Sequence, residues 1–510
     1  MGLFATGNKL NIKSTKRLKT QILRRPALQF IKDIYKKYPE VNVYLVGGAV
    51  RDYFLDRKVY DLDFVVTGIK GSVLEKFLAR RGDIKKVGRV FGIFKFKPKD
   101  IKQAPHYDIA LPRTEKSTGP RYQDFKVTSN SQYTIKEDLR RRDFNINAMA
   151  VDLKTGELID PHKGLESLRL GELKTVRDPF KRFREDHTRL LRALRFAVVL
   201  DFDFCRKTWD ALRELLPNIQ STVRVGDKML PVVPRETIAR EFLKAFHANP
   251  VRTITLYRRS GALKFLIPEV LKLEGVEQGY GPGMRAWDAW EQTLHVLSNL
   301  PQNAPLELQL AVLFSKTGKV IVREKKSGRT VFPEYQSASA EVFLNTVKKL
   351  RMSSTARTSK YWVDQKLIAW LIEQHVLIFR RDVRRLKRSV IFQRLVQNPK
   401  RGRLLVRLFI AEATALPYKK KRQRMQLIRV LQWRIKRVTT IARRLDITDK
   451  TSLVSGDFIQ KELKLDQGPL VGAYLKEAQS FALNYMLRNK QKPNRVRIIR
   501  HLKKFKPNTK

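Results

Sequence analysis

The chain has 510 residues, of which 42% are hydrophobic and 9% aromatic, so it can build about two to four packed domains and is too apolar to be disordered throughout. Its 105 lysines and arginines against 49 acidic residues give a net charge of +56, which favours nucleic acid as a partner. A run of about 18 apolar residues, as a membrane-spanning helix needs, is absent from the sequence. The single cysteine, Cys205, excludes an internal disulfide and a cysteine-based zinc site and fits a reducing compartment.

The first 32 residues contain no acidic residue but several lysines and arginines. We expect residues 1–30 to form a basic N-terminal arm, which could contact RNA or act as a mitochondrial transit peptide. The sequence does not choose between these two roles. We expect a cytoplasmic protein, with a mitochondrial location as the alternative.

A helix is predicted over 27–38, where apolar residues recur at helical spacing, and a short apolar strand over Val43–Val46 follows it. Gly47 and Gly48 then allow the backbone to turn sharply and to approach a phosphate closely. Arg51 lies on the opening turn of the next predicted helix. Helix-start N–H groups and a guanidinium suit the triphosphate of a nucleotide.

Asp61 and Asp63 stand two residues apart where the sequence becomes apolar, so a strand over 61–66 would direct both carboxylates to one side. Two carboxylates on one strand, completed by phosphate oxygens of a substrate, can hold Mg²⁺ for nucleotidyl transfer. The alternative is a pair of solvated aspartates on an edge strand. The glycine turn and the arginine before them favour the metal site.

Residues 47–52, GGAVRD, followed by DLD at 61–63, resemble the head domain of class II tRNA nucleotidyltransferases, the CCA-adding enzymes, whose close relatives are bacterial poly(A) polymerases. The resemblance implies an α+β protein, in which a nucleotidyltransferase head with a small mixed β-sheet precedes an all-helical neck, body and tail. It implies Asp61 and Asp63 as catalytic metal ligands for Mg²⁺. Gly47, Gly48 and Arg51 would then hold the incoming nucleotide.

Further elements of the head follow: a helix over 72–79, strands over 83–87, 91–96 and 106–111, and a polar lid loop over 116–132. The strand over 106–111 carries Asp108, a candidate third catalytic carboxylate. The turn over 88–94, with Gly88 and Gly92, resembles the CCA-adding form of this region, whereas bacterial poly(A) polymerases carry an arginine-rich sequence there.

Residues 140–150, RRRDFNINAMA, resemble the family motif in which an RRD triplet recognises the ribose of the nucleotide. Asp143 can accept from a hydroxyl, and Arg142 can donate to it or to phosphate. The alternative is an ordinary charged helix start. Asn145 and Asn147 extend the match and favour the nucleotide-binding role.

A helix is predicted over 182–202, with Asp186, Arg189, Arg192 and Arg195 spaced by three. A carboxylate that accepts and a guanidinium that donates can together present an edge like that of a nucleobase. Asp186 and Arg189 stand in EDHTR, which resembles the E-D-x-x-R motif that pairs with the incoming base without a template. Arg192 and Arg195 would orient that pair or reach the triphosphate. The alternative for Asp186 and Arg189 is an ordinary salt bridge on the surface of a helix.

The remaining chain reads as helical, with a neck helix over 235–246 preceded by a loop over 221–234. In many bacterial relatives an HD-type hydrolase domain follows the neck. Here Gln292 stands at the expected metal histidine, and Ser315 and Lys316 replace the expected His-Asp pair. Since a lysine opposes a divalent cation, we predict an HD-like body without a metal site.

We therefore predict a head at 31–155, a neck at 156–257 that binds RNA and the nucleobase, an HD-like body at 258–440 and a basic C-terminal module at 441–510. The predicted function is template-independent addition of CCA to the tRNA 3′ end from CTP and ATP. The expected partner is tRNA, bound at its 3′ end and its acceptor and T arms, with neither a membrane nor an obligate protein partner. The alternatives are a poly(A) polymerase of the same superfamily and a catalytically idle RNA-binding protein.

Overall fold

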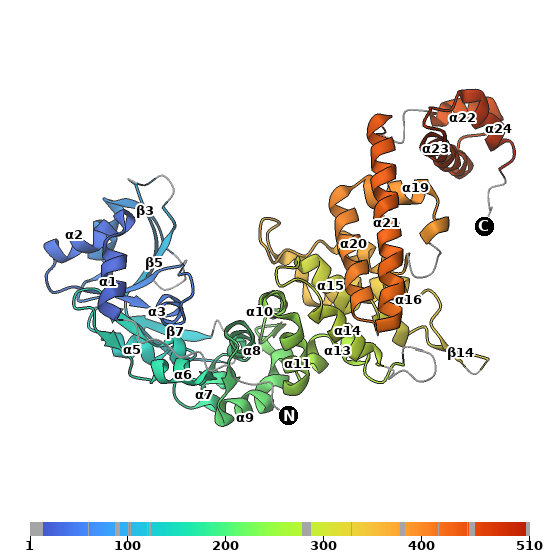
Figure 1. Cartoon of the computed structure of the whole chain (residues 1–510). Coiled ribbons are helices and arrows are strands. Elements are labelled where there is room, and N and C mark those ends of the chain that lie inside the picture. The colour runs from blue at the N-terminus through green and yellow to red at the C-terminus, as the bar shows by residue number, and fades with distance from the viewer. Residues whose placement is uncertain are drawn as a thin grey trace. The chain divides into compact units, whose positions relative to one another are not determined.

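The computed structural model describes residues 14–59, 61–86, 92–99, 101, 104–119, 121, 124–277, 287–327, 329–377, 383–416, 418–445, 447 and 454–505. Its contacts divide the chain into two compact units, residues 1–266 and 267–510. Figure 1 shows most of the strands in the blue-to-cyan part of the chain and mainly helices over the rest, which confirms the predicted α+β class. The finer division into five parts stays a prediction.

The first unit is built on a seven-stranded sheet in the order β3-β4-β5-β2-β1-β8-β9. Neighbouring strands are antiparallel except for β2 and β5, which run parallel. The strands are β1 (Asn42–Val46), β2 (Asp63–Thr67), β3 (Gly82–Lys86), β4 (Ile93–Pro98), β5 (Tyr107–Ala110), β8 (Ala150–Asp152) and β9 (Leu158–Ile159).

The core beneath the site joins the central strands to a helix. Val46 of β1 and Val65 of β2 belong to one buried cluster with Leu139 of α5 (Ile135–Arg140), and all three side chains are at most 2% exposed. Apolar residues on the central strands are buried, whereas Asp63 at the start of β2 is exposed. The sheet is therefore a rigid support whose strand ends carry the polar groups.

Helices α1 (Thr15–Leu23), α2 (Gln29–Lys37), α3 (Gly48–Phe54), α4 (Gly71–Ala79) and α6 (Gly164–Leu170) complete the head. The described end of the predicted N-terminal arm is the helix α1, whose Leu18 and Ile22 are buried. Tyr53 of α3 donates to the Ser14 carbonyl at 3.0 Å, so this segment is fixed to the head. Residues 1–13, the rest of the predicted arm, and most of the turn over 88–94 lie outside the described residues.

Two predicted loops are wrong in part because they contain paired strands. The segment over 116–132 includes the ends of β6 (Arg113–Ser117) and β7 (Phe125–Ser129), which form an antiparallel hairpin. The segment over 221–234 contains the hairpin of β12 (Thr222–Val225) and β13 (Lys228–Pro231). Both hairpins are polar and largely outside the core, so they lack the buried alternation that identifies strands in a sequence.

The rest of the first unit is mainly helical, with the two-stranded pair β10 (Glu172–Leu173) and β11 (Asp203–Phe204). Its helices are α7 (Pro179–Glu185), α8 (Thr188–Leu200), α9 (Arg206–Leu215), α10 (Arg235–Ala248), α11 (Pro250–Ser260) and α12 (Ala262–Leu266). The predicted helix over 182–202 is wrong near its start, since α7 ends at Glu185 and α8 begins at Thr188, with Asp186 in an extended backbone conformation between them (φ −155°, ψ 102°). The predicted neck helix is confirmed as α10.

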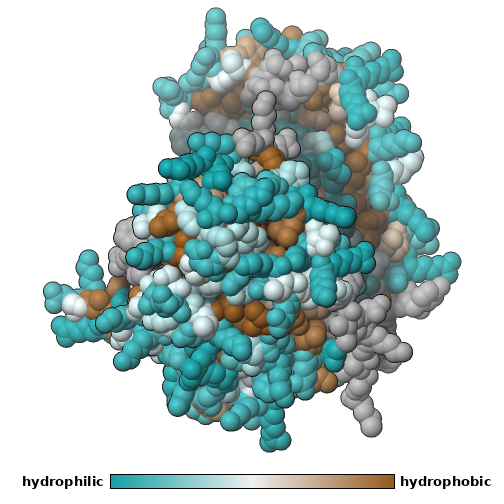
Figure 2. Space-filling view, turned by 90° about the vertical axis from the view of Figure 1, so that its left-hand side faces the viewer, coloured by the Kyte–Doolittle hydropathy of each residue, from teal (hydrophilic) through white to brown (hydrophobic). Residues whose placement is uncertain are grey.

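The second unit contains α13 (Pro268–Leu271), α14 (Ala289–Ser298), α15 (Leu306–Phe314), α16 (Tyr335–Leu350), α17 (Gln365–Gln374), α19 (Arg388–Ile391), α20 (Pro399–Thr414), α21 (Tyr418–Arg444), α22 (Gly456–Leu463), α23 (Pro469–Asn489) and α24 (Arg495–Leu502), with a hairpin of β14 (Glu324–Lys326) and β15 (Arg329–Val331). Among the described residues, no helix is both long and apolar enough to cross a bilayer. Figure 2 shows that hydrophilic side chains cover most of the face in view, as the net charge requires.

A buried ion pair occupies the place where the sequence predicts a lost metal site. Lys316 donates to Glu412 of α20 at 2.7 Å and to Ser315 at 3.3 Å, and all three residues are at most 6% exposed. Buried charges are tolerated when they are paired and hydrogen-bonded. The Lys316 cation therefore has a protein carboxylate as its partner, while the HD-like assignment of this unit stays a prediction.

Candidate active site

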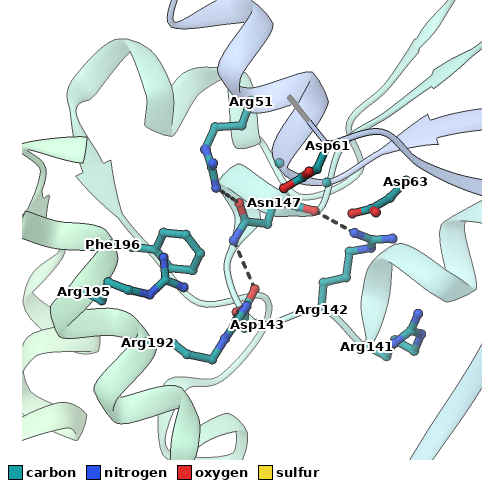
Figure 3. Close-up of a pocket in the computed structure, with 12 residues that line it drawn as sticks. Arg51, Asp61, Asp63, Arg141, Arg142, Asp143, Asn147, Arg192, Arg195 and Phe196 are labelled. Atoms are coloured by element: carbon teal, nitrogen blue, oxygen red, sulfur yellow. Dashed lines mark hydrogen bonds and ion pairs between the residues drawn. The ribbon is translucent and has the colours of Figure 1, made fainter. Parts of the chain in front are cut away.

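A cavity of about 560 Å³ opens in the first unit where the β1–α3 turn, the start of β2, the segment after α5 and the helix α8 converge (Figure 3). It brings together nine of the twelve predicted site residues. The lining residues are Gly47, Gly48, Arg51, Asp61, Asp63, Arg141, Arg142, Asp143, Asn147, Arg192, Arg195 and Phe196. Asp61 and Asp63 thus face a group of guanidiniums across one opening.

Gly47 makes the turn between β1 and α3 in a backbone conformation that L side chains rarely adopt, with φ of 70°. A Cβ on Gly47 would lie only 2.8 Å from Nη1 of Arg142, so a side chain there would displace the Arg142 guanidinium. The helix α3 begins at Gly48, and Arg51 follows on its first turn. The predicted strand, glycine turn and helix are confirmed.

The two aspartates of the predicted metal site both line the cavity, but they do not share a strand. Asp63 begins β2, whereas Asp61 lies in the segment before it, so the prediction of one strand carrying both is wrong. Asp63 pairs in register with Asp108 of β5. Asp108 does not line the cavity, and its Oδ1 lies 3.9 Å from Nζ of Lys95.

The charge around Asp63 is suited to a cation. Partial removal of its carboxyl from water, and then the nearby Asp108 and Asp61 carboxylates, raise the pKa of Asp63 despite the opposing effect of Arg142. Among the described residues, no group of three or more His, Cys, Asp or Glu side chains is placed to hold a metal. A metal on Asp61 and Asp63 would therefore need further oxygen ligands from a substrate, as phosphates supply.

A chain of hydrogen bonds crosses the cavity from α3 to α8 (Figure 3). Nη1 of Arg51 donates to Oδ1 of Asn147 at 2.6 Å, and Nδ2 of Asn147 donates to Oδ1 of Asp143 at 3.3 Å. Nε and Nη2 of Arg192 then donate to Oδ2 of Asp143, at 2.8 and 2.5 Å. Two guanidiniums from different helices are thus held by one carboxylate and one amide.

The ring of Phe196 on α8 lies beside these two guanidiniums and a third, that of Arg195 (Figure 3). Its ring is 6% exposed, and its centroid lies 4.0, 5.3 and 5.4 Å from Cζ of Arg195, Arg51 and Arg192, respectively. Guanidiniums at these distances are attracted by an aromatic face. Arg195 also pairs through Nε with Glu241 of α10, at 2.5 Å, which fixes its position. The ring and the carboxylate hold three cations close together against their mutual repulsion.

The arginines on the opposite wall are held by Asp138 of α5, a side chain with no exposed area. It accepts from Arg141 at 2.7 and 2.8 Å and from Arg142 at 3.1 Å. Burial alone would raise the pKa of Asp138, but the two arginines outweigh it and lower the pKa. Arg142 also donates to the Asn147 carbonyl at 3.3 Å, so the predicted RRD segment is a rigid wall of the cavity.

Asp186 and Arg189 lie outside the lining of the cavity. Oδ1 of Asp186 accepts from the backbone N–H and the hydroxyl of Thr188, at 2.9 and 2.6 Å, and this contact accompanies the start of α8. Arg189 is buried and donates to the Arg182 carbonyl and to Glu185, both at 3.0 Å. Oδ2 of Asp186 lies 3.9 Å from Nε of Arg189, so the two side chains are neighbours. Arg192, which lines the cavity, lies one turn further along α8.

Sequence reasoning did not assign site roles to Arg141, Asn147 and Phe196, which also line the cavity. Arg141 stands within the RRR run and Asn147 within the matched motif, so the sequence could have indicated a site role for both. Phe196 follows Arg195 directly and reads as a core residue of an amphipathic helix. Only the packing shows that three guanidiniums gather on its ring.

Comparisons with known proteins give relatives for the part of the chain that holds this cavity. Residues 43–174 match the family model of the poly A polymerase head domain. The chain is 34% identical over 286 residues to the multifunctional CCA protein of Neisseria meningitidis serogroup A, covering 55% of this chain and 61% of that protein. It is 33% identical over 329 residues to the multifunctional CCA protein of Paracidovorax citrulli, covering 62% of this chain and 71% of that protein.

The chain spans about three fifths of the length of the Neisseria relative. Among solved structures, it is similar to the Bacillus stearothermophilus CCA-adding enzyme in complex with CTP, with a TM-score of 0.60 and 22% identity, covering 94% of this chain and 97% of that chain. At this identity the likeness shows a shared fold.

Proposed function

The chain belongs to the family of multifunctional CCA proteins, and from this premise we propose that it adds cytidine and adenosine to the 3′ end of tRNA without a nucleic-acid template. The substrates are CTP, ATP and a tRNA held at its 3′ end and its acceptor and T arms, and the leaving product is pyrophosphate. The Bacillus structure is described as a complex with CTP, and a Thermotoga maritima relative as a complex with tRNA. The predicted cytoplasmic location is part of this proposal.

One observation carries the proposal: the cavity sets Asp61 and Asp63 opposite Arg51, Arg142 and Arg192 around a glycine turn. A nucleoside triphosphate is polyanionic, so guanidiniums bind its phosphates while carboxylates repel them unless a cation lies between. An enzyme that bound only a neutral ligand would not need both charges in one cavity.

The carboxylates fit a divalent metal, and we propose Mg²⁺, because they are hard oxygen ligands whose mutual repulsion a cation relieves. When bound, the metal supplies positive charge that stabilises the developing charge on the reacting oxygens. Asp61 and Asp63 would hold it, with Asp108 beside Asp63 keeping the local field negative.

In the proposed reaction the RNA 3′-hydroxyl oxygen forms a bond to the α-phosphorus of the nucleotide and gives up its proton to solvent, while the bond from that phosphorus to the bridging oxygen breaks and pyrophosphate leaves. Gly47 and Gly48 let the backbone approach the phosphates closely. Arg51 holds the triphosphate, and Arg142 contacts the ribose or a phosphate. Asp143 holds Arg192 in place, and Arg195 adds charge for the departing pyrophosphate.

Base selection is proposed for Asp186 and Arg189, which offer an acceptor and a donor as neighbours. Arg189 already has two partners, the Arg182 carbonyl and Glu185, so nucleotide binding would have to exchange these bonds for bonds to the base. An exchange of this kind costs less than exposing a new charge, because one hydrogen bond replaces another.

The test is incubation of the purified chain with Mg²⁺ and tRNA lacking its last three nucleotides, with CTP alone, ATP alone or both, followed by product sizing and sequencing. Addition of two cytidines with CTP, and of one adenosine when ATP is also present, supports the proposal. A long adenylate tail from ATP alone would identify a poly(A) polymerase instead. Failure to incorporate either nucleotide would favour an idle RNA-binding protein.

A further inference from the structure

The helix α21 (Tyr418–Arg444), the longest described helix, contains many lysines and arginines and no acidic residue (Figure 1). One side of it packs into the second unit, where Ile428, Leu431 and Val438 are at most 2% exposed. The other side carries the cations. A helix with charge of a single sign on its outer side repels itself unless an anion neutralises it.

Trp433 interrupts this basic side as an exposed aromatic residue. It is 59% exposed, although burial of an indole is strongly favourable. It lines two adjoining cavities, of about 450 and 300 Å³, and none of the described residues that line them is acidic. The cations beside it include Lys436, Arg437 and Arg444 in the larger cavity, and Arg388, Arg434 and Arg437 in the smaller one.

Three of these cations are held in place by contacts with other groups of the protein. Arg434 donates from both of its terminal nitrogens to the backbone carbonyls of Val383 and Leu386. Arg388 donates to the Leu487 carbonyl at 2.7 Å. Cζ of Arg437 lies 5.4 Å from the centroid of the Trp433 ring. These three guanidiniums are thus positioned before any ligand binds, which lowers the entropy cost of binding.

We propose that Trp433 and the cations around it form a second RNA-binding surface that takes one unpaired nucleotide. The base stacks on the indole, and the flanking phosphates contact Arg437, Lys436 and Arg444. Stacking on an aromatic side chain combined with basic residues is how proteins bind single-stranded RNA. The surface consists of residues of the second unit only, whereas the candidate active site consists of residues of the first.

Charge decides the choice of RNA as the occupant. A protein partner would need an acidic surface to match these cations, and an apolar one would bury them unpaired. RNA supplies both a ring for Trp433 and phosphates for the arginines. The inference rests on the proposed function only in taking RNA as the ligand, and it does not require nucleotide transfer.

The test compares Trp433→Ala with the wild-type full chain for binding of two fluorescently labelled RNAs, a single-stranded oligoadenylate and a blunt-ended duplex, by anisotropy. We expect Trp433→Ala to bind the single strand about 5- to 100-fold more weakly, the range that one stacked base gives, and the duplex within about twofold of wild type. Trp433→Phe, which keeps a ring, should recover most of the single-strand affinity.

Arg422→Ala is the matched control, since Arg422 is exposed on the same helix but lines neither cavity. It should weaken both RNAs alike. Unchanged single-strand binding by Trp433→Ala would overturn the proposal, and so would an equal loss for both RNAs; either result would leave a protein partner as the reason for the exposed ring.

Incorporation of CTP, measured in parallel, separates the two proposals. A wild-type chain that transfers no nucleotide but loses single-strand binding with Trp433→Ala would overturn the proposed function and support the stacking surface. If the wild-type chain transfers nucleotides and Trp433→Ala binds the single strand as tightly as wild type, the proposed function is supported and the stacking surface is overturned.

Discussion

The carboxylate of Asp143 accepts two hydrogen bonds from the guanidinium of Arg192, at 2.8 and 2.5 Å, and thereby ties the segment after α5 to the helix α8. Its other oxygen accepts from the Phe144 backbone at 2.9 Å and from Asn147 at 3.3 Å. Burial alone would raise the pKa of Asp143, but Arg192 and these hydrogen bonds outweigh it and hold the pKa far below its usual range. Asp143 is therefore ionised and fully engaged, and we expect it to position Arg192 rather than to bind ribose alone.

Replacing Asp143 by asparagine should lower kcat/KM for CTP about 10- to 100-fold, because hydrogen bonds to a charged group are lost and Arg192 is free to move. The shape of the side chain is kept, so the fold should survive. Steady-state kinetics with tRNA lacking its last three nucleotides measures the effect. Asp210→Asn, which changes an exposed ion pair with Arg206 on α9, is the matched control and should leave kcat/KM unchanged. Equal activity of the two variants would contradict the positioning role.

Asn147→Ala should raise KM for CTP more than it lowers kcat. The amide accepts from Arg51 and donates to Asp143, so its loss frees the Arg51 side chain while Arg192 keeps its carboxylate partner. One lost hydrogen bond to a charged group corresponds to about a tenfold change. If kcat fell while KM stayed constant, Arg51 would act in the chemical step and not in nucleotide binding.

How far the sequence predicts this site depends on whether a residue's role is local. Gly47, Gly48 and Arg51 lie within one turn of chain, so residue type and spacing were enough to predict their arrangement. Phe196 acquires its role from arginines on two separate helices, and Asp143 from Arg192, 49 residues away. No periodicity encodes such contacts.

The break around Asp186 shows the same limit on a smaller scale. The spacing by threes from Asp186 to Arg195 is typical of one helix, but the Asp186 side chain hydrogen-bonds the backbone of Thr188 and replaces a helical bond. Aspartate often competes with helix geometry in this way. The polar hairpins β6–β7 and β12–β13 were missed because exposed strands lack an apolar face.

Asp61→Ala should abolish CTP incorporation, with a loss of about a thousandfold or more, and leave tRNA binding nearly intact. The reason is that Asp61 would supply one of only two protein ligands to the metal. Filter binding of tRNA and incorporation of labelled CTP are measured on the same preparation. Asp83→Asn, an exposed aspartate on β3, is the control. Retained incorporation by Asp61→Ala would exclude this carboxylate from the metal site.

The raised pKa of Asp63 gives a pH dependence linked to metal. As pH falls through this pKa, Asp63 takes up a proton and loses its affinity for a cation, so activity should fall at a higher pH than for an ordinary aspartate. More Mg²⁺ should move this acidic limb to lower pH. If the pH at which activity falls does not change with Mg²⁺ concentration, Asp63 is not a ligand of the metal.

Without metal, Asp63 makes the free energy of unfolding change with pH in the opposite direction to that expected for a salt-bridged aspartate. Because the folded state holds the Asp63 proton more tightly than the unfolded state, the free energy of unfolding decreases as pH rises from the ordinary aspartate pKa through the raised one. Asp63→Asn should therefore raise Tm at neutral pH in chelator, and this gain should vanish in acid.

His375 is buried in the second unit beside the Lys316–Glu412 pair. Its Nε2 lies 3.1 Å from the Tyr335 hydroxyl. Burial, aided by the positive charge of Lys316 and against the attraction of Glu412, lowers the pKa of His375 to about 4. The ring is neutral in the folded protein, whereas in the unfolded chain it takes up a proton near pH 6.5.

Between about pH 6.5 and about pH 4 the unfolded state therefore binds more protons, and the free energy of unfolding should fall by up to about 3 kcal/mol as the pH decreases through this window. His375→Gln removes the titrating group and should flatten the curve there. Urea unfolding across the window measures it, with the exposed His106→Gln as the control. A wild-type curve that stays level, or a His375→Gln curve that falls as steeply, would show that the buried ring does not set the acid sensitivity of this unit.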